Sequence, residues 1–477
     1  MTAAMNETLR LAQAFPPPDR EAWLALVAKT LKGAGADSLA RRTADGLVLP
    51  ALGDSVASPR VLEPRPLRAP LEADALAWDI RALVPTSEPS AARDEARETL
   101  EGGASSLLLR IEGDPADIPA ILQDVAPEIA AVALDPGAAG RTAARALDSA
   151  ARASPTARLA FHLDPLSAFA EAGAWPGGLG EEIRACAALA ARLAEIYPRS
   201  SLCLASGQVA HEAGATPAQE IAFAAAAAVA YARAMTAAGL PPAEAFSRLT
   251  FGLAVEPEPF AAIAKLRAAR AVFARLSAAG GVEAPVRLEA RASRRALTRA
   301  EPWTNLVRLT AAAFAAAVGG ADAVMLEPHD AWLGGGDAQS LRLARNVQLV
   351  LMAEGQIGRV ADPAGGAWAL ESHSDALARA AWREFRRIEA AGGLAEALQS
   401  GDIALAVGQA RDALILDYRE GRRRLLGITD FAPSVAPLPA PAQRPRPPAD
   451  PSPGGAGVVC PPLTPVRLED LAQEARA

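Results

Sequence analysis

The sequence contains few residues that bind metals or form disulfides. Its 477 residues include only three cysteines and four histidines. The cysteines, Cys186, Cys203 and Cys460, are too few and too widely spaced for a disulfide framework or a thiolate metal site. No histidine lies in an H-E-x-x-H spacing or in a comparable arrangement of metal ligands. We therefore expect reduced thiols and no metal centre.

The sequence also lacks a long apolar segment and an excess of basic residues. The longest apolar stretch, residues 221–232, is mostly alanine and is followed by Arg233, which favours a packed helix over a bilayer span of roughly 20 residues. Residues 1–15 do not follow the charged and then apolar plan of a secretory signal. The formal net charge of -7 disfavours nucleic acid as a partner. These features predict a cytoplasmic protein with a large core and no contact with a membrane.

From about residue 77 the chain alternates short apolar runs with longer helical patterns, which is typical of βαβ units and a parallel sheet. The runs that qualify as strands are residues 77–84, 106–111, 130–134, 158–163, 201–205, 249–255, 285–290 and 322–326. Eight such runs predict a (β/α)8 TIM-type barrel. A doubly wound sheet is the competing architecture, but no G-x-G-x-x-G motif follows the first run and no Walker-type lysine loop is present.

Composition divides the chain into three parts. Residues 1–75 combine one short helical stretch, 21–31, with proline-spaced sequence, which predicts an extended N-terminal arm. Residues 76–430 hold the predicted barrel and the helices that follow it. Residues 431–477 begin with a dense run of prolines that leaves few backbone donors, and they predict a flexible tail.

Two patterns could carry chemistry, and each has a structural alternative. His211 and Glu212 follow the strand 201–205, and catalytic groups of barrel enzymes gather at the carboxyl ends of strands. Adjacent residues in a loop usually point apart, however, which favours a structural role for both. Gly334 to Gly336, followed by Asp337, could hold an anion at a helix start. A turn leading into an Asp N-cap is the more common use of that pattern.

The densest basic cluster lies around the end of the seventh predicted strand. Its members are Arg287, Arg291, Arg294, Arg295 and Arg299. A polyanionic ligand such as the phosphates of coenzyme A could bind there. Glu289 and Glu301 could equally pair with these arginines, and a solvated or subunit-facing patch is then the alternative.

Several segments resemble the methylmalonyl-CoA mutase family. The string S-L-R-L-A-R-N-V-Q-L at 340–349 is similar to the family's S-A-R-I-A-R-N-T-Q-L, and A-D-P-A-G-G at 361–366 is similar to I-D-P-W-G-G. Shorter matches are E-A-G-A-T at 212–216 and P-W-T-N-L at 302–306. The N-terminal stretch between 21 and 46 looks in particular like the small subunit of the heterodimeric bacterial enzyme. The resemblance implies a barrel that opens to admit an acyl-CoA.

The positions that carry catalysis in that family differ in this chain. The family's S-G-Y-H-M-Q places its substrate-contacting histidine on Val209, two positions before His211. In the family's R-T-H-S-Q-T-S-G, Glu289 and Arg291 stand where a histidine and a glutamine line the acyl-CoA site. The tyrosine that helps to generate the radical is missing from residues 78–83, and no histidine satisfies the cobalt-ligating pattern D-x-H-x-x-G.

The resemblance therefore implies a non-catalytic small subunit with no cobalamin-binding domain. Its partner would be a homologous large subunit that carries adenosylcobalamin and the acyl-CoA and interconverts (R)-methylmalonyl-CoA and succinyl-CoA. The arm at 1–75 would wrap that partner, and the basic cluster would serve as a coenzyme A or interface patch. The alternatives are a free-standing acyl-CoA-binding or acyl-CoA-processing barrel without cobalamin, and an assembly factor that holds the large subunit transiently.

Overall fold

A closed barrel of parallel strands forms the centre of the molecule. The structure is a computed structural model that describes residues 19–53, 77–334, 337–433 and 457–476. The strands follow the order β10-β11-β3-β4-β5-β6-β8-β9 around the barrel. They are β3 (Asp79–Pro85), β4 (Ser106–Arg110), β5 (Ala131–Asp135), β6 (Leu159–Leu163), β8 (Ser201–Ser206), β9 (Leu249–Val255), β10 (Arg287–Ala292) and β11 (Ala323–Met325). Each coincides with a predicted run to within two residues at either end, and the (β/α)8 barrel is confirmed.

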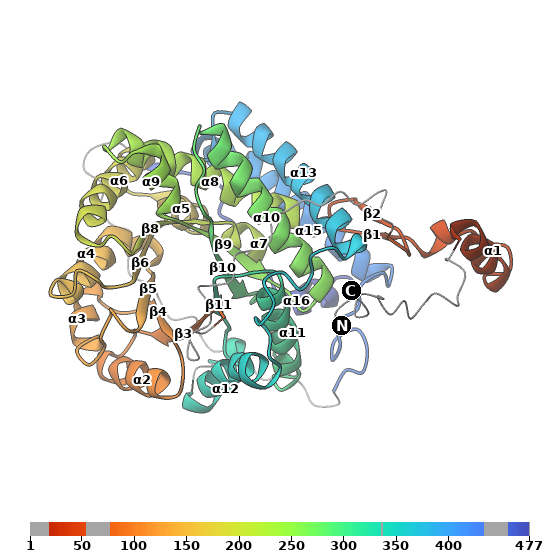
Figure 1. The fold of residues 1–477 in the computed structure, drawn as a ribbon, viewed down its shortest axis with the longest axis horizontal. Helices are drawn as coiled ribbons and strands as arrows, with labels where there is room; N and C mark the ends of the chain where they lie inside the picture. The colour runs from red at the N-terminus through yellow and green to blue at the C-terminus, as the bar shows by residue number, and fades with distance from the viewer. Residues whose placement is uncertain (1–18, 54–76, 335–336, 434–456, 477) are drawn as a thin grey trace, which may run out of the picture.

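Helices surround the barrel in the alternation that the sequence predicts (Figure 1). The longer ones are α2 (Pro89–Glu101), α4 (Gly140–Ala151), α6 (Leu179–Ile196), α8 (Pro217–Ala237), α10 (Pro259–Ala279), α11 (Thr304–Val318) and α12 (Ala338–Leu349). The shorter ones are α3 (Ile118–Ile121), α5 (Pro165–Ala172), α7 (Gln208–Glu212) and α9 (Pro242–Ser247). None of the helices in the described ranges is both long and apolar enough to cross a bilayer.

Local sequence signals explain where several helices begin. Thr216 and Gln219 form a reciprocal capping box at the start of α8, and Pro217 occupies the first turn, where its missing N–H costs nothing. Asp337 is the N-cap of α12 and accepts the backbone N–H of Ser340 at 2.7 Å. The N-cap interpretation of the sequence before α12 is therefore confirmed, whereas Gly335 and Gly336 lie outside the described residues.

Three helices follow the barrel in the region predicted to be helical, namely α13 (Trp368–Ala390), α14 (Leu394–Gln399) and α15 (Asp402–Arg419). Helix α13 packs across α8 and α10 on the outside of the barrel (Figure 1). The buried positions of α8 and α10 extend around most of each helix because α13 covers the side that would otherwise face solvent.

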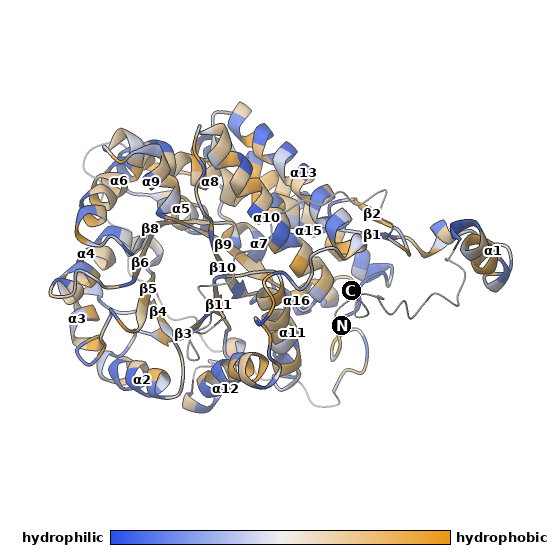
Figure 2. Ribbon diagram, viewed as in Figure 1, coloured by the Kyte–Doolittle hydropathy of each residue, from blue (hydrophilic) through white to orange (hydrophobic). Residues whose placement is uncertain are grey.

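The described part of the N-terminal arm has two regions that differ in their contacts. Helix α1 (Arg20–Thr30) buries none of its residues and projects from the body of the molecule, with hydrophilic and hydrophobic residues on its surface (Figure 2). The hairpin of β1 (Arg41–Arg42) and β2 (Val48–Leu49) instead contacts the body of the molecule, where Leu47 between the two strands packs against the main core. In this hairpin region, Asp45 accepts the backbone N–H of Ala218 in α8 at 3.0 Å.

The prediction of a flexible tail over 431–477 is wrong for residues 457–476. Strand β12 (Val458–Val459) pairs with β7 (Ala174–Trp175), and α16 (Leu468–Glu474) packs on α15. The proline-rich stretch suggested flexibility, but Leu463, Leu468 and Leu471 downstream of it supply apolar anchors that are buried. Residues 434–456, which contain most of those prolines, lie outside the described residues.

Replacing Leu468 by alanine is expected to release this C-terminal segment. Leu468 is 3% exposed in a cluster with Leu414 and Tyr418, and truncating a buried leucine costs about 2–5 kcal/mol. We expect amide hydrogen exchange of residues 457–476 to accelerate by at least about tenfold, because local opening then requires less free energy. Leu405→Ala is the matched control, since Leu405 on α15 is 65% exposed. Equal exchange in both variants would contradict the packing described here.

Candidate functional site

A carboxylate lies between two guanidinium groups in the lumen of the barrel. Glu289 on β10 forms ion pairs with Arg81 on β3 and, at 2.5 Å, with Arg291 on its own strand. All three side chains are buried. Residues 287, 289 and 291 alternate with residues whose side chains pack against the outer helices, and strand geometry therefore places this odd-numbered set in the lumen.

The charges continue toward the carboxyl ends of the strands. Arg291 lies 3.5 Å from Asp135 at the end of β5, and Asp135 is 3.2 Å from Arg110 at the end of β4. Arg110 pairs in turn with Glu327, which follows β11, at 2.5 Å. The remaining lumen is filled by a small apolar cluster that includes Leu83, Leu108, Ala133, Ala160 and Met325. Ion pairs and apolar side chains together occupy this part of the lumen.

His162 on β6 borders this network in an unusual backbone conformation. Its φ is 48°, a left-handed value that is rare for residues other than glycine, and the pairing of β6 with β8 shifts register between Ala160 and Leu163. The ring is fully buried, with Nδ1 2.7 Å from the carbonyl oxygen of Leu134 and Nε2 3.6 Å from Glu289. The irregularity in β6 thus turns a histidine side chain toward the central carboxylate.

Burial and neighbouring charges set the protonation states in the lumen. Burial alone would raise the pKa of Glu289, but Arg291 and Arg81 outweigh it and hold that pKa well below its usual range. The pKa of His162 is lowered to about 4, mainly by burial. Arg291 and Arg81 lower this pKa further, and the opposing effect of Glu289 only partly compensates. At neutral pH the lumen therefore contains a carboxylate between two guanidinium groups, beside a neutral imidazole.

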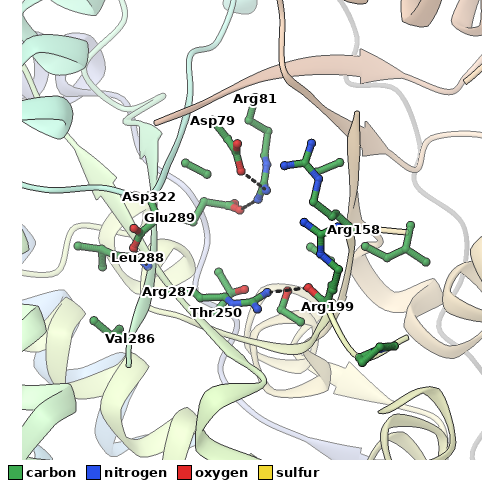
Figure 3. A pocket seen from close by; sticks show the side chains of 16 residues that line it. Asp79, Arg81, Arg158, Arg199, Thr250, Val286, Arg287, Leu288, Glu289 and Asp322 are labelled. Atoms are coloured by element: carbon green, nitrogen blue, oxygen red, sulfur yellow. Dashed lines mark hydrogen bonds and ion pairs between the residues drawn. The ribbon is translucent and has the colours of Figure 1, made fainter. Parts of the chain in front are cut away.

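A cavity of about 560 Å³ opens at the amino ends of the strands. Its lining comes from the first residues of most barrel strands, and Figure 3 shows Arg158, Arg199 and Arg287 around it. The Arg81–Glu289 ion pair lies on its inner wall (Figure 3). Enzymes with this fold bind substrates at the opposite end of the barrel, so the cavity is not at the expected place for an active site.

His211 and Glu212 do not form an acid–base pair. The ring of His211 lies 2.8 Å from Ser293 Oγ through Nε2 and 3.2 Å from Glu220 through Nδ1. Glu212 points elsewhere and accepts the backbone N–H groups of Arg294 and Arg295 at 3.0 and 2.9 Å. The structural interpretation of the sequence, that the two adjacent side chains diverge, holds.

Ser293, His211 and Glu220 have the order of groups that nucleophilic catalysis uses, but their surroundings do not suit it. All three are buried, and Glu220 is also bound by Lys265 at 2.6 Å. Burial alone would raise the pKa of Glu220, but Lys265 and His211 outweigh it and lower the pKa to about 2. The amides next to Ser293 that would stabilise an oxyanion already donate to Glu212. This network connects the loops after β8 and β10.

The predicted basic cluster is not one patch. Arg287 lies at the mouth of the cavity and Arg291 lies in the lumen. Arg294 stacks on Trp332 with its guanidinium 4.7 Å from the ring centre. Arg295 pairs with Glu256 at 3.0 Å, and Arg299 contacts Glu469 and Asp470 of the C-terminal segment. These five arginines therefore do not form the single coenzyme A or interface patch that the sequence suggested. Those on β10 and those in the loop after it lie at different heights in the barrel and have different partners.

The structure also identifies lumen residues that were not singled out from the sequence. These are Arg110, Asp135, His162 and Glu327. A signal was present for two of them, since the apolar runs L-L-L-R and V-A-L-D each end in a charged residue at the carboxyl end of a strand. Val209, the position of the family histidine, lies in α7 and is half-buried against the main core.

We expect His162 to make the protein sensitive to mild acid. A histidine whose pKa falls from 6.5 to about 4 on folding contributes stability that is complete above pH 6.5 and is lost as the pH falls toward 4. The loss amounts to roughly 3 kcal/mol over that range. His162→Asn keeps a residue that tolerates the left-handed conformation and cannot titrate there. Urea unfolding at pH 7, 6, 5 and 4 should therefore show a shallower decline for the variant, and parallel declines would refute the assignment.

Comparisons with known proteins agree with the resemblance seen in the sequence. The family model described as methylmalonyl-CoA mutase matches residues 149–446. A methylmalonyl-CoA mutase small subunit of Streptomyces virginiae is 33% identical over 100% of this chain and 79% of that protein. The small subunit of Propionibacterium freudenreichii subsp. shermanii is 35% identical over 68% of this chain and 52% of that protein.

A large subunit is also similar. The methylmalonyl-CoA mutase large subunit of Streptomyces virginiae is 34% identical, over 49% of this chain and 32% of that protein. The similarity to small subunits thus extends over more of the chain than the similarity to this large subunit. With the closed eight-stranded barrel and the matched family model, the chain belongs to the methylmalonyl-CoA mutase family and groups with its small subunits.

Proposed function

We propose that this chain is the non-catalytic small subunit of an adenosylcobalamin-dependent methylmalonyl-CoA mutase. It stabilises a homologous large subunit in the cytoplasm, and the large subunit interconverts (R)-methylmalonyl-CoA and succinyl-CoA. The observation that carries the proposal is the occupied lumen, in which Arg81, Glu289 and Arg291 form buried ion pairs on the barrel axis.

The side chains on the axis support a silent role because a substrate would have to displace them. Glu289 and Arg291 stand at the two positions where the family has a histidine and a glutamine that line the acyl-CoA site. Separating Arg81 from Glu289 would break a buried ion pair, and breaking such a pair costs about 3–5 kcal/mol. Val209 offers no hydrogen-bonding group in place of the family histidine. In the described part of the chain, buried ion pairs and Val209 thus stand where the family has polar contacts for a thioester.

The histidines present do not fit adenosylcobalamin, which supplies the radical chemistry of this family when it is bound. Both ring nitrogens of His211 already have partners, Ser293 and Glu220. His162 lies inside the lumen, His373 is buried on α13, and His329 lies beneath Trp303 with ring centres 4.7 Å apart. A lower ligand to cobalt needs an accessible imidazole nitrogen whose other nitrogen is oriented by a hydrogen bond. We therefore place the cofactor and the acyl-CoA on the large subunit.

The proposal is tested by comparing the isolated chain with the reconstituted complex. Adenosylcobalamin titrated into the isolated chain should leave the cobalamin absorption bands unchanged, and methylmalonyl-CoA should not turn over. Co-expression with the large subunit should yield a stable complex that is active. Inactivating the large subunit should abolish all turnover of that complex. Turnover by the isolated chain would establish instead the free-standing acyl-CoA enzyme, and a complex that dissociates at micromolar concentration would favour the assembly factor.

The projecting helix α1 is the part of the chain best suited to contact the partner. It buries none of its residues against its own barrel, and Leu24 and Leu26 are exposed on it. A single short helix cannot form a core of its own, and apolar side chains held in solvent mark interaction sites. The hairpin at 41–49 anchors this helix to the barrel through Asp45 and Ala218. We infer that α1 extends onto the large subunit.

Removing residues 1–33 should therefore weaken the complex without destabilising the barrel. We expect an unchanged melting temperature for the isolated chain and a loss of affinity for the large subunit of about tenfold or more, since apolar anchors are removed. Asp45→Ala is the matched control, because it removes the acceptor for the N–H of Ala218 and leaves α1 intact. It should lower the melting temperature more than the truncation does. Unchanged partner binding by the truncated chain would overturn this role of α1.

A further inference from the structure

The junction between β6 and β8 is an irregular part of the barrel wall. In the described ranges, the pairing of β6 with β8 is the one between barrel strands that shifts register. The shift lies between Ala160 and Leu163, around the left-handed His162. By contrast, β9 and β10 pair without interruption over residues 287–292. An irregular register disrupts the ladder of hydrogen bonds, so this junction depends more than the others on contacts from outside the sheet.

The C-terminal segment, residues 457–476, crosses this junction at the carboxyl end of the barrel. On the β6 side, β12 pairs with β7, and the N–H of Leu463 donates to the carbonyl oxygen of Ala170 in α5 at 2.7 Å. On the β8 side, the N–H of Val466 donates to the carbonyl oxygen of Glu212 in α7 at 2.8 Å. Between residues 463 and 466 the chain therefore passes from the elements that follow β6 to those that follow β8.

Buried side chains fix the C-terminal segment on both sides of the crossing. Leu463 is 2% exposed and belongs to the main core, whereas Leu468 and Leu471 are buried in a second apolar cluster. The crossing also contains Pro462 and Pro465. Proline restricts the unfolded chain, so a segment that contains it loses less conformational entropy when it becomes ordered. The segment is thus stiff and is anchored at both ends.

Two side-chain contacts cross the same junction. The hydroxyl of Tyr231 on α8 donates to Asp164, which follows β6, at 2.5 Å. The hydroxyl of Ser167 on α5 donates to the carbonyl oxygen of Ser206 at the end of β8 at 3.4 Å. Both contacts belong to elements that would themselves move if the junction separated. The C-terminal segment instead lies across these elements and can detach as a local unit.

We propose that residues 457–476 are a clasp that holds the barrel closed between β6 and β8, and that release of this clasp opens the lumen at that junction. Opening there would expose His162 and Glu289, which are buried and 3.6 Å apart on the lumen side. The inference rests on the fold and does not depend on the function proposed above.

The test is amide hydrogen exchange of the full chain that carries Leu463→Ala. We expect exchange of residues 159–163 and 201–206 to accelerate by at least about tenfold, because the junction then opens at a lower free energy. Residues 287–292, in the uninterrupted pairing of β9 with β10, should exchange at the parent rate. Val459→Ala is the matched control, since Val459 lies in the same segment and is 70% exposed.

Two cysteines show whether the clasp has been released from a folded barrel. Cys460 is buried in the clasp, and Cys203 is buried between β8 and α8, with its Sγ 3.9 Å from the sulfur of Met235. A thiol reagent should alkylate Cys460 faster in the Leu463→Ala chain than in the parent, while Cys203 remains protected. If the alanine variant does not fold, Leu463→Val is the milder truncation and should accelerate exchange at the same residues to a smaller extent.

Three outcomes would overturn the proposal. Acceleration confined to residues 457–476 would mean that the junction stays closed without the clasp. Equal acceleration in residues 287–292 would mean that the segment only adds to the stability of the whole barrel. Alkylation of Cys460 at the parent rate would mean that Leu463 does not hold the segment in place.

Discussion

The ionised Glu289 side chain on the barrel axis is the constraint on which the other lumen contacts depend. It is held between Arg81 and Arg291, and removing the carboxylate would break two buried ion pairs at once. The network continues through Asp135, Arg110 and Glu327, so that side chains from β3, β4, β5 and β10 and from the loop after β11 are joined by charge. Ion pairs therefore join five elements of the barrel across its lumen.

The same carboxylate accounts for the irregular strand β6. The left-handed His162 and the shifted register of β6 are costly in isolation, because an L-residue rarely adopts that conformation. The irregularity places an imidazole 3.6 Å from Glu289, where it fills space beside the ion pairs and donates to the carbonyl oxygen of Leu134 as a neutral ring. These contacts with Leu134 and Glu289 offset the local strain.

The fold could be predicted from the sequence because its signals are local. Each barrel strand is an apolar run flanked by helix-length segments, and the Thr216 capping box is contained within four residues. The lumen could not be predicted because its contacts join residues far apart in the chain, such as Arg81 with Glu289 and Arg110 with Glu327.

The basic cluster failed as a prediction for a related reason. Strand residues advance about 3.3 Å each, so Arg287 and Arg291 lie roughly 13 Å apart along β10 although they are near neighbours in sequence. Arg295 and Arg299 then follow a loop to other partners, Glu256 and Glu469. The C-terminal segment was mistaken for part of a flexible tail because a proline-rich composition describes the stretch before it and not the buried leucines after it.

In this barrel the carboxyl end is covered and the amino end is open, which is the reverse of the usual arrangement in barrel enzymes. At the carboxyl end, the C-terminal segment crosses the loops after β8 and β10, where the N–H groups of Val466 and Leu468 donate to the carbonyl oxygens of Glu212 and Arg295. Trp332 after β11 is held between the guanidinium groups of Arg294 and Arg467. In barrel enzymes these loops bind the substrate, and here they bind one another and the chain's own C-terminal segment. The amino end, which commonly serves stability alone, retains the open cavity. The carboxyl end of this barrel is thus held together by the chain's own loops and C-terminal segment.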